Sequence, residues 1–281
     1  MIYPHNIGEN LGIDELSLSK GELYTFVTNK SGKGKKKTLV AVIKGTKSQD
    51  IIDVLNKISL DKRKLVKEIT LDMANNMQLA SRMCFPESSL VTDRFHVVKL
   101  VLDALQHQRI KLRWEAIEKE NQAIKQAKEQ GIKYIPIILE NDDTPKQLLA
   151  RSRYIIAKKQ NQWTDNQKIR AELLFKNYPS LHQGYKHILE FRNIYEQTSR
   201  EIAKEQILAW IEKTKSLKLN DFNTAANSLK YHLETILNFF VKRHTNANAE
   251  SFNSKVKLFR ANQRGVVDVK FFLFRMEKLF S

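Results

Sequence analysis

The residues LGIDELSL at positions 11–18 place an aspartate, Asp14, in the middle of an apolar stretch. A stretch of this length and composition is typical of a β-strand with a buried face. A carboxylate among core residues is unfavourable unless it pairs with a positive charge or binds a cation. These eight residues therefore predict a sheet whose first strand carries an acid that either pairs with a positive charge or binds a cation.

The segments that follow extend this sheet. Residues 22–28 and 39–43 have the composition of two further strands, and the lysine-rich residues 31–36 form the loop between them. Three antiparallel strands therefore open the chain. The elements expected next, in chain order, are a helix over residues 49–65, a buried strand at 68–72, a short helix at 76–83 and a strand at 89–93.

The order of these elements predicts an α/β fold with a ribonuclease-H-like mixed sheet, in which three antiparallel strands are followed by two parallel ones. From about residue 97 to residue 241 the apolar residues recur at helical spacing, apart from a short apolar piece at 134–138. We therefore expect residues 1–98 to form the first part of the ribonuclease-H-like domain and residues 99–240 to form an all-helical insertion. Residues 241–281 are expected to complete the ribonuclease-H-like domain with C-terminal helices.

Two such helices are visible in the C-terminal pattern. Thr245 or Asn246 is the expected N-cap of the first helix, which continues past Phe259 and ends at Gly265. Residues 269–280 predict a terminal amphipathic helix.

The composition of the 281 residues excludes several classes of protein. Only nine glycines and five prolines are present, which argues against an all-β sandwich or barrel with many tight turns. No apolar run of about eighteen residues occurs, so no transmembrane helix is expected. The N-terminus lacks the pattern of a secretory signal, and the single cysteine, Cys84, cannot form an internal disulfide. We therefore expect a cytoplasmic protein without a membrane partner.

The charge of the chain indicates a polyanionic partner. Forty-eight Lys and Arg residues against 31 Asp and Glu residues leave a formal net charge of +17. Cations cluster with aromatic residues between positions 146 and 170, which suits phosphate neutralisation and base stacking. Lys158 and Lys159 are expected DNA contacts. Trp163 is interpreted either as core packing or as a wedge that stacks on a base.

Further acids stand where other predicted strands end. Asp72 follows the fourth strand and Asp93 the fifth, while Glu250 lies near the start of a late helix. A single aspartate at a strand end is more often a cap or a turn residue. In a ribonuclease-H-like sheet, however, the first and fourth strands are neighbours, which brings Asp14 close to Asp72, and a glutamate from a covering helix can complete the site. Oxygen ligands of this kind hold two hard cations about 3.5–4 Å apart, which activate a hydroxyl nucleophile and stabilise the leaving oxygen of a phosphodiester.

Several blocks of the sequence resemble the DDE transposases of bacterial insertion sequences. The resemblance is to the ISL3 type, and within it to the shorter ISAon-like branch. It implies cleavage and strand transfer at the DNA ends of an insertion sequence, with Mg²⁺ as the cofactor and Mn²⁺ able to replace it. The blocks that carry the resemblance are GIDELS at 12–17, TLDM at 70–73, DRFHVVK at 93–99, WTDNQ at 163–167, TNANAESFN at 245–253, FRA at 259–261 and RGV at 264–266.

The resemblance implies that Asp14, one later aspartate and Glu250 are the metal ligands. Strand geometry favours Asp72 as the second aspartate. The block from Asp93 to His96 resembles an auxiliary motif of related transposases, and Asp93 is the alternative ligand. His96 is interpreted either as a supporting residue that orients a carboxylate or contacts DNA, or as a helix-capping histidine.

The helix that carries Glu250 has further polar residues on the same face. Asn253, Ser254 and Lys257 follow Glu250 by three, four and seven residues. We expect Asn253 and Lys257 to contact DNA beside the metal site. The alternative is a solvated stripe on the helix surface. Arg260 and Arg264, from the last two blocks, are further expected DNA contacts.

The position of Asp14 near residue 1 leaves no room for a preceding domain that reads the element ends. Either the sequence is part of a longer protein, or a separate N-terminal DNA-recognition polypeptide supplies this function. We also expect a homo-oligomer in the synaptic complex. The competing interpretations are a structure-selective nuclease with the same site and a non-catalytic DNA-binding descendant, but a pure DNA-binding protein has no need of four such acids.

Overall fold

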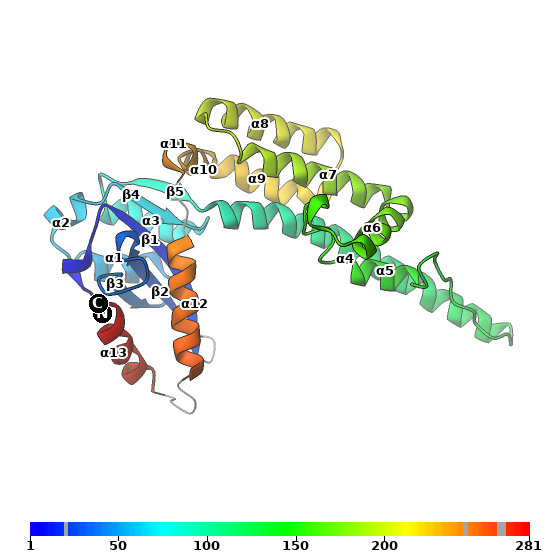
Figure 1. The fold of residues 1–281 in the computed structure, drawn as a ribbon, viewed down its shortest axis with the longest axis horizontal. Helices are drawn as coiled ribbons and strands as arrows, with labels where there is room; N and C mark the ends of the chain where they lie inside the picture. The colour runs from blue at the N-terminus through cyan, green and yellow to red at the C-terminus, as the bar shows by residue number, and fades with distance from the viewer. Residues whose placement is uncertain (20–21, 244–246, 263–267) are drawn as a thin grey trace. The chain divides into compact units, whose positions relative to one another are not determined.

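The computed structural model describes residues 1–19, 22–243, 247–262 and 268–281 (Figure 1). The chain divides into two compact units, which are described separately below. Unit 1 comprises Met1–Val97, Thr198–Arg200 and His232–Ser281. Unit 2 comprises Val98–Gln197 and Glu201–Tyr231.

Unit 1 is built on a five-stranded mixed sheet with the strand order β3-β2-β1-β4-β5. The central strand β1 pairs antiparallel with β2 and parallel with β4, β2 pairs antiparallel with β3, and β4 pairs parallel with β5. All five predicted strands are present, and the ribonuclease-H-like sheet is confirmed. The strands are β1 (Asn10–Ser19), β2 (Glu22–Asn29), β3 (Leu39–Lys44), β4 (Glu68–Leu71) and β5 (Ser89–Thr92).

One face of the sheet packs against the helices α1 (Ser48–Leu55) and α3 (Asn75–Cys84). Successive side chains of a strand point to opposite faces, so Leu11 and Ile13 of β1 enter this core while Asp14 points to the other face. The apolar residues of this core include Val27, Ile43, Ile51, Leu55, Ile69, Met77 and Ala80.

The expected helix over residues 49–65 is two shorter helices. After α1 ends at Leu55, the chain turns so that Ile58 is buried in the same core, and α2 (Leu60–Lys64) follows. The guanidinium of Arg63 donates hydrogen bonds to the backbone oxygens of Ile58 (3.0 Å) and Cys84 (2.6 Å), which fixes the turn. The apolar spacing alone did not reveal this break. Ile58 fits the helical spacing of Ile51 and Leu55, and it is also buried in the same core when the helix ends before it.

Two C-terminal helices, α12 (Ala247–Asn262) and α13 (Val269–Phe280), cover the opposite face of the sheet (Figure 1). Asp268 is the N-cap of α13, where its carboxylate accepts hydrogen bonds from the backbone N–H groups of Lys270 and Phe271. The predicted terminal helix is therefore confirmed. The apolar residues buried on this face are Tyr3, Leu16, Tyr24, Phe26, Leu39, Val42, Phe252, Val256, Phe272, Met276 and Phe280.

The predicted ends of the first C-terminal helix cannot be compared with the described residues. Thr245, Asn246 and Gly265, the expected cap and end of the first helix, lie outside the described residues. Two short helices, α10 (Leu233–Leu237) and α11 (Phe239–Lys242), lead into this part of unit 1.

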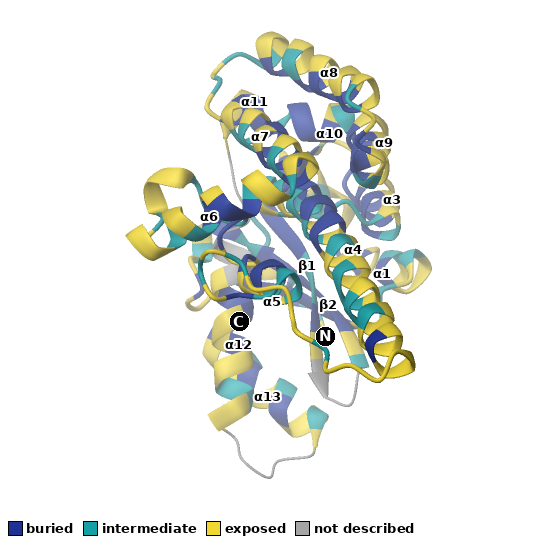
Figure 2. Cartoon of the chain, turned by 90° about the vertical axis from the view of Figure 1, so that its right-hand side faces the viewer, coloured by how far each residue is buried: buried dark blue, intermediate teal, exposed yellow. Residues whose placement is uncertain are grey.

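Unit 2 is helical, and no strand occurs among its described residues. Buried aromatic side chains hold its helices together: the rings of Phe191 and Trp210 lie 5.0 Å apart, and His187 stacks on Trp210 at 4.2 Å. Figure 2 shows the buried and the exposed residues of α7. Its helices are α4 (Arg94–Glu129, of which residues 94–97 belong to unit 1), α5 (Pro145–Arg151), α6 (Asp165–Asn177), α7 (Pro179–Ile194), α8 (Arg200–Ser216, from residue 201) and α9 (Asn223–Tyr231).

Among the helices of the described residues, none combines the length and the hydropathy that a membrane crossing requires.

The packing of α12 on the sheet leads to a stability prediction. Phe252 is fully buried, with its ring 4.9 Å from that of Phe280 and 6.2 Å from that of Phe26. We expect Phe252→Ala to lower the free energy of unfolding by about 3–5 kcal/mol, because it leaves a cavity in this core. The measurement is urea denaturation followed by circular dichroism.

Leu258, on the same helix, is the matched control because 63% of it is exposed. Leu258→Ala should change the free energy of unfolding by no more than about 0.5 kcal/mol. Equal urea midpoints for the Phe252 variant and the unmodified protein would show that α12 does not close this face.

Candidate active site on the central strands

The register of the parallel strands aligns three aspartates. On β1 and β4 the last paired residues are Gly12 and Thr70, which precede Asp14 and Asp72 by two positions each. The pairing of β4 with β5 ends one residue before Asp72 and Asp93. Adjacent strands lie about 4.8 Å apart, so these three residues form a row across three neighbouring strands. The predicted proximity of Asp14 and Asp72 follows from this register.

Asp14 lies inside the sheet and its carboxylate is held by two donors. Oδ1 accepts a hydrogen bond from the backbone N–H of Glu15 at 2.8 Å, and Oδ2 accepts one from the side-chain amide of Asn253 at 2.6 Å. Asn253 lies on α12 and is buried. The helix that covers the sheet therefore also positions the acid at its centre.

The charge state of Asp14 depends on its neighbours. Burial raises the pKa of the Asp14 carboxyl above its ordinary value, and the negative charges of Asp72 and Asp93 act in the same direction. The backbone N–H of Glu15 and the charge of His96 act against this rise. The charges of three neighbouring side chains thus act on Asp14, and a divalent cation would relieve the repulsion between it and the other acids.

Asp72 and Asp93 differ in their surroundings. Asp72 is partly exposed, and its Oδ1 accepts a hydrogen bond of 2.8 Å from the backbone N–H of Ala74. Asp93 is 2% exposed, and its Oδ1 accepts a long contact of 3.5 Å from the backbone N–H of Phe95 at the start of α4. Of the two aspartates, Asp72 is thus the more accessible to solvent and to a substrate.

A buried cation lies on the same face of the sheet, and sequence reasoning missed it. Lys30 follows β2 and is 9% exposed; its Nζ lies 3.4 Å from Oε1 of the buried Glu68 and donates a hydrogen bond to Oγ1 of Thr70. Thr70 lies on β4, and Asp72 follows it by two residues directly after the strand, so both point to one face. Burial lowers the pKa of Lys30, while the charges of Glu68 and Asp93 oppose that effect.

The sequence did contain one signal for this pair. Glu68 opens an apolar strand, and a buried acid needs a cationic partner. Lys30, in contrast, is one of several lysines in a row of loop residues, and nothing in its spacing distinguishes it from the others.

His232 is a second residue that sequence reasoning did not include. It is 8% exposed, and its Nδ1 lies 3.1 Å from the side-chain amide nitrogen of Gln78 on α3. Burial lowers the pKa of His232, and the charge of Asp72 acts in the opposite direction. Asp72 therefore has an imidazole within electrostatic reach, although 160 residues separate the two in sequence.

The other predicted residues of unit 1 are distributed along α4 and α12. The ring of His96 packs edge-on against Phe95 at 5.5 Å. Glu250 belongs to the backbone of α12, one turn before Asn253, but its side chain lies outside the described part of the structure. Lys257 is exposed on the same helix.

Two predicted arginines follow on the same helix or just beyond it. The guanidinium of Arg260 lies over the ring of Phe272, 5.1 Å from its centre. Arg264 lies outside the described residues.

The remaining predicted residues lie in unit 2. The indole of Trp163 donates a hydrogen bond from Nε1 to the backbone oxygen of Ile155 at 2.9 Å and stacks on the ring of Tyr185 at 5.6 Å. These contacts are those of a packed side chain with one accessible edge. Lys158 and Lys159 are partly exposed nearby in the sequence.

The chemistry of the donor set fits a hard divalent cation. Asp14 and Asp72 offer carboxylate oxygens, which Mg²⁺ and Mn²⁺ prefer, and the pKa of Asp14 is raised first by burial and then by the charges of Asp72 and Asp93. Among the side chains that the structure describes, no three histidines, cysteines or acids converge closely enough to complete a metal site. The side chain of Glu250, the third expected ligand, is not among them.

Sheet topology and acid placement together define the class of protein. A sheet of order β3-β2-β1-β4-β5, with acids on β1 and after β4, is that of the ribonuclease-H-like enzymes that act on phosphodiesters. A family model described as "Transposase", that of the ISL3-type DDE transposases, matches residues 11–276. The chain therefore belongs to the ISL3-type DDE transposase family. No curated protein matches the chain.

The buried ion pair beneath the acids leads to a stability prediction. We expect Lys30→Met to lower the free energy of unfolding by about 3–5 kcal/mol, because it removes the cation that faces the buried carboxylate of Glu68. Urea denaturation measures this change. The double variant Lys30→Met with Glu68→Gln removes both charges and should be more stable than the single variant. If the single variant matched the unmodified protein, the buried pair would not exist in solution.

Proposed function

We propose that this chain is the catalytic polypeptide of a transposase that cleaves phosphodiester bonds at the ends of an insertion sequence and joins the ends to target DNA. The observation that carries the proposal is the row formed by Asp14 on β1 and by Asp72 and Asp93 directly after the adjacent strands β4 and β5. Membership of the transposase family supports DNA as the partner and a divalent cation as the cofactor.

The proposed ligands are Asp14, Asp72 and Glu250, with Asp93 as the alternative second aspartate. When bound, two Mg²⁺ or Mn²⁺ ions would activate the attacking hydroxyl and stabilise the leaving oxygen. Asn253 orients Asp14 by its hydrogen bond to Oδ2, and the backbone N–H of Ala74 orients Asp72. These donors hold the acids in place before DNA binds.

His96 is proposed as a supporting residue of this site. Its charge lowers the pKa of Asp14, so a protonated His96 favours the ionised carboxylate that a metal ion requires.

The proposed DNA contacts extend over both units. They include the helix α12 beside the acids and the basic segment around residues 146–170 of unit 2. The proposed contact residues are Asn253, Lys257, Arg260, Arg264, Lys158, Lys159 and Trp163. In this proposal, residues 1–98 and 241–281 form the catalytic domain, and residues 99–240 form a helical insertion.

Recognition of the element ends is assigned to a separate N-terminal DNA-recognition polypeptide. The active form is proposed to be a homo-oligomer in the synaptic complex, in the cytoplasm and associated with the nucleoid. A strand-transfer assay separates the proposal from a simple nuclease: joining of a pre-cut 3′-hydroxyl end to target DNA supports a transposase, and hydrolysis alone supports a nuclease.

The first functional prediction concerns the acids. We expect Asp14→Asn and Asp72→Asn each to lower Mg²⁺-dependent cleavage of end DNA at least a hundredfold, equivalent to about 2.7 kcal/mol, because each removes a charged ligand at nearly constant volume. Glu250→Gln should have the same effect. Asp93→Asn should reduce the rate less than Asp72→Asn does. Gel-based cleavage assays in Mg²⁺ and Mn²⁺ measure these rates.

Asp61→Asn is the matched control, since Asp61 is exposed in the first turn of α2. It should cleave like the unmodified protein. A fully active Asp14 variant with an unchanged melting temperature would refute the proposed site. An active Asp72 variant beside an inactive Asp93 variant would move the second ligand to Asp93.

The second functional prediction concerns DNA binding by this chain alone. Binding through phosphate contacts should weaken steeply with salt and carry little sequence information. We expect the affinities for an element end and for a scrambled duplex to differ by less than about tenfold, or 1.4 kcal/mol. Filter binding at two salt concentrations measures both. Discrimination of about a thousandfold, as in specific complexes, would show that the chain itself reads bases.

A further inference from the structure

Residues 132–138 of unit 2 form an extended apolar segment that the rest of the unit leaves uncovered. The segment follows α4 and forms no strand. The exposed fractions of its isoleucines are 59% for Ile132, 81% for Ile135, 69% for Ile137 and 53% for Ile138. Folded monomers rarely expose a continuous apolar surface of this kind unless it binds a partner.

The backbone of this segment is also unpaired. Within the described residues, no hydrogen bond joins the N–H or C=O groups of residues 133–138 to any other group. The two ends are anchored, because Ile132 N–H donates to Ala127 O at 2.9 Å and Leu139 N–H donates to Asp143 O at 2.9 Å. An extended backbone with free donors and acceptors is a template for pairing with another strand.

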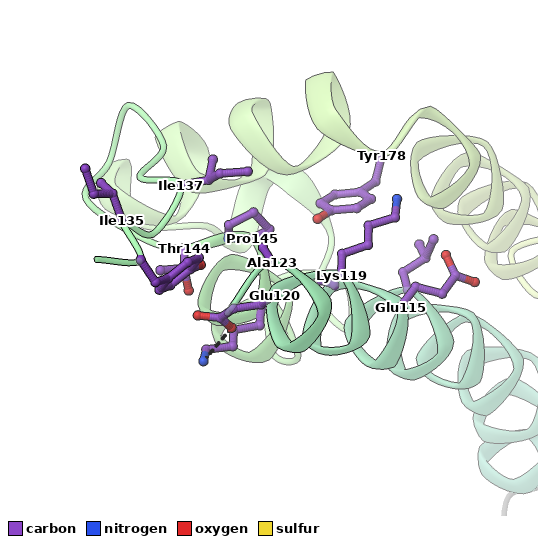
Figure 3. A pocket seen from close by; sticks show the side chains of 13 residues that line it. Glu115, Lys119, Glu120, Ala123, Ile135, Ile137, Thr144, Pro145 and Tyr178 are labelled. Atoms are coloured by element: carbon purple, nitrogen blue, oxygen red, sulfur yellow. Dashed lines mark ion pairs between the residues drawn. The ribbon is translucent and has the colours of Figure 1, made fainter. Parts of the chain in front are cut away.

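The segment does not pack closely on the helix beneath it. A cavity of about 300 Å³ is lined by residues of α4, including Ala116 and Ala123, and by residues of the segment, including Ile135 and Ile137 (Figure 3). An ion pair of 2.6 Å between Lys146 and Glu120 lies at this cavity. The apolar side chains of the segment are thus not buried in the core of their own unit.

We propose that residues 132–138 pair with the same segment of a second copy of this chain, as an antiparallel two-stranded ladder centred on Pro136. A two-fold interface uses one surface twice, so the partner necessarily has the free backbone edge and the apolar side chains that this segment requires. Residues 132–138 would thus be the surface through which the homo-oligomer of the proposed function forms, and the proposal rests on that function only for the existence of such an oligomer.

The single proline of the segment restricts the register. Pro136 has no N–H, so it fits only a position whose N–H is not used by the ladder. In an antiparallel pair such positions alternate with hydrogen-bonded ones. When Pro136 lies opposite Pro136 of the second copy, Ile135 of each copy lies opposite Ile137 of the other. These two residues then exchange backbone hydrogen bonds. This register uses only backbone groups that have no partner within the described residues.

The charges at the two ends of the segment complement one another. Lys133 is exposed at the N-terminal end, while Glu140 and Asp142 are exposed just beyond the C-terminal end. Glu140 already contacts Lys176 at 2.6 Å, but both side chains are about 70% exposed. Antiparallel pairing brings the basic end of one copy to the acidic end of the other, whereas a parallel pair would align like charges.

Disulfide cross-linking tests this register directly. The single native cysteine, Cys84, is fully buried, so Pro136→Cys introduces the one accessible thiol of the chain. Residues opposite each other at a non-hydrogen-bonded position have Cα atoms about 4.5 Å apart, which is within the range of a disulfide. Oxidation of the full-length variant with copper phenanthroline should therefore give a covalent dimer on a non-reducing gel.

Ile169→Cys is the matched control, because Ile169 is an apolar residue of the same unit with 60% exposure. It should remain monomeric on the gel at the same protein concentration. Equal cross-linking of the two variants would show random collision and overturn the proposal.

Sedimentation of the protein without engineered cysteines is the second measurement. The double variant Ile135→Asp with Ile137→Asp should raise the dimer dissociation constant at least a hundredfold, because it places four like charges in the ladder, while Ile169→Asp should leave it unchanged. Circular dichroism should show the same helix content in all variants, since the segment is not part of the core.

The Asp14→Asn variant should dimerise like the unmodified protein, which separates this interface from the catalytic proposal. A monomeric unmodified protein at high concentration, or a dimer that the double variant leaves intact, would overturn the inference.

Discussion

The partial burial of Asp14 in the central strand is the constraint on which the rest of unit 1 depends. A carboxylate partly removed from water is stabilised by donors or cations within the protein. The backbone N–H of Glu15 supplies one donor and the amide of Asn253 supplies another. Because α12 also contributes Phe252 and Val256 to the core, polar and apolar contacts hold this helix in one position on the sheet.

The same face of the sheet has an unequal charge balance. Asp14, Asp72 and Asp93 lie in a row, and Lys30 with its partner Glu68 adds no net charge to them. The acids therefore retain an excess of negative charge in a chain whose overall charge is +17. The positive charge of the rest of the chain suits the phosphates of DNA, the partner that membership of the transposase family implies.

The helical unit satisfies different demands. Its core is aromatic, with Phe191, Trp210 and Tyr185 fully or almost fully buried, and it does not need the sheet to cover them. Residues 132–138 are not part of this core, and their isoleucine side chains stay exposed. An unpaired extended segment on a stable helical support is suited to association, because little of the unit must rearrange when a partner binds.

The amino-acid sequence by itself determined the order of the elements, all five strands, the helical character of the middle of the chain and the acids at the strand ends. These features follow from periodicities of two and of about 3.6 residues, which are local. The tertiary structure decided which groups meet the acids: Asn253 reaches Asp14 from 239 residues away, and Lys30 meets Glu68 across 38. It also decided that helix 49–65 breaks at Ile58 and that residues 134–138, apolar and β-like, find no strand partner. Local periodicity predicts which face of an element is apolar, but the neighbour of that face depends on how distant segments fold together.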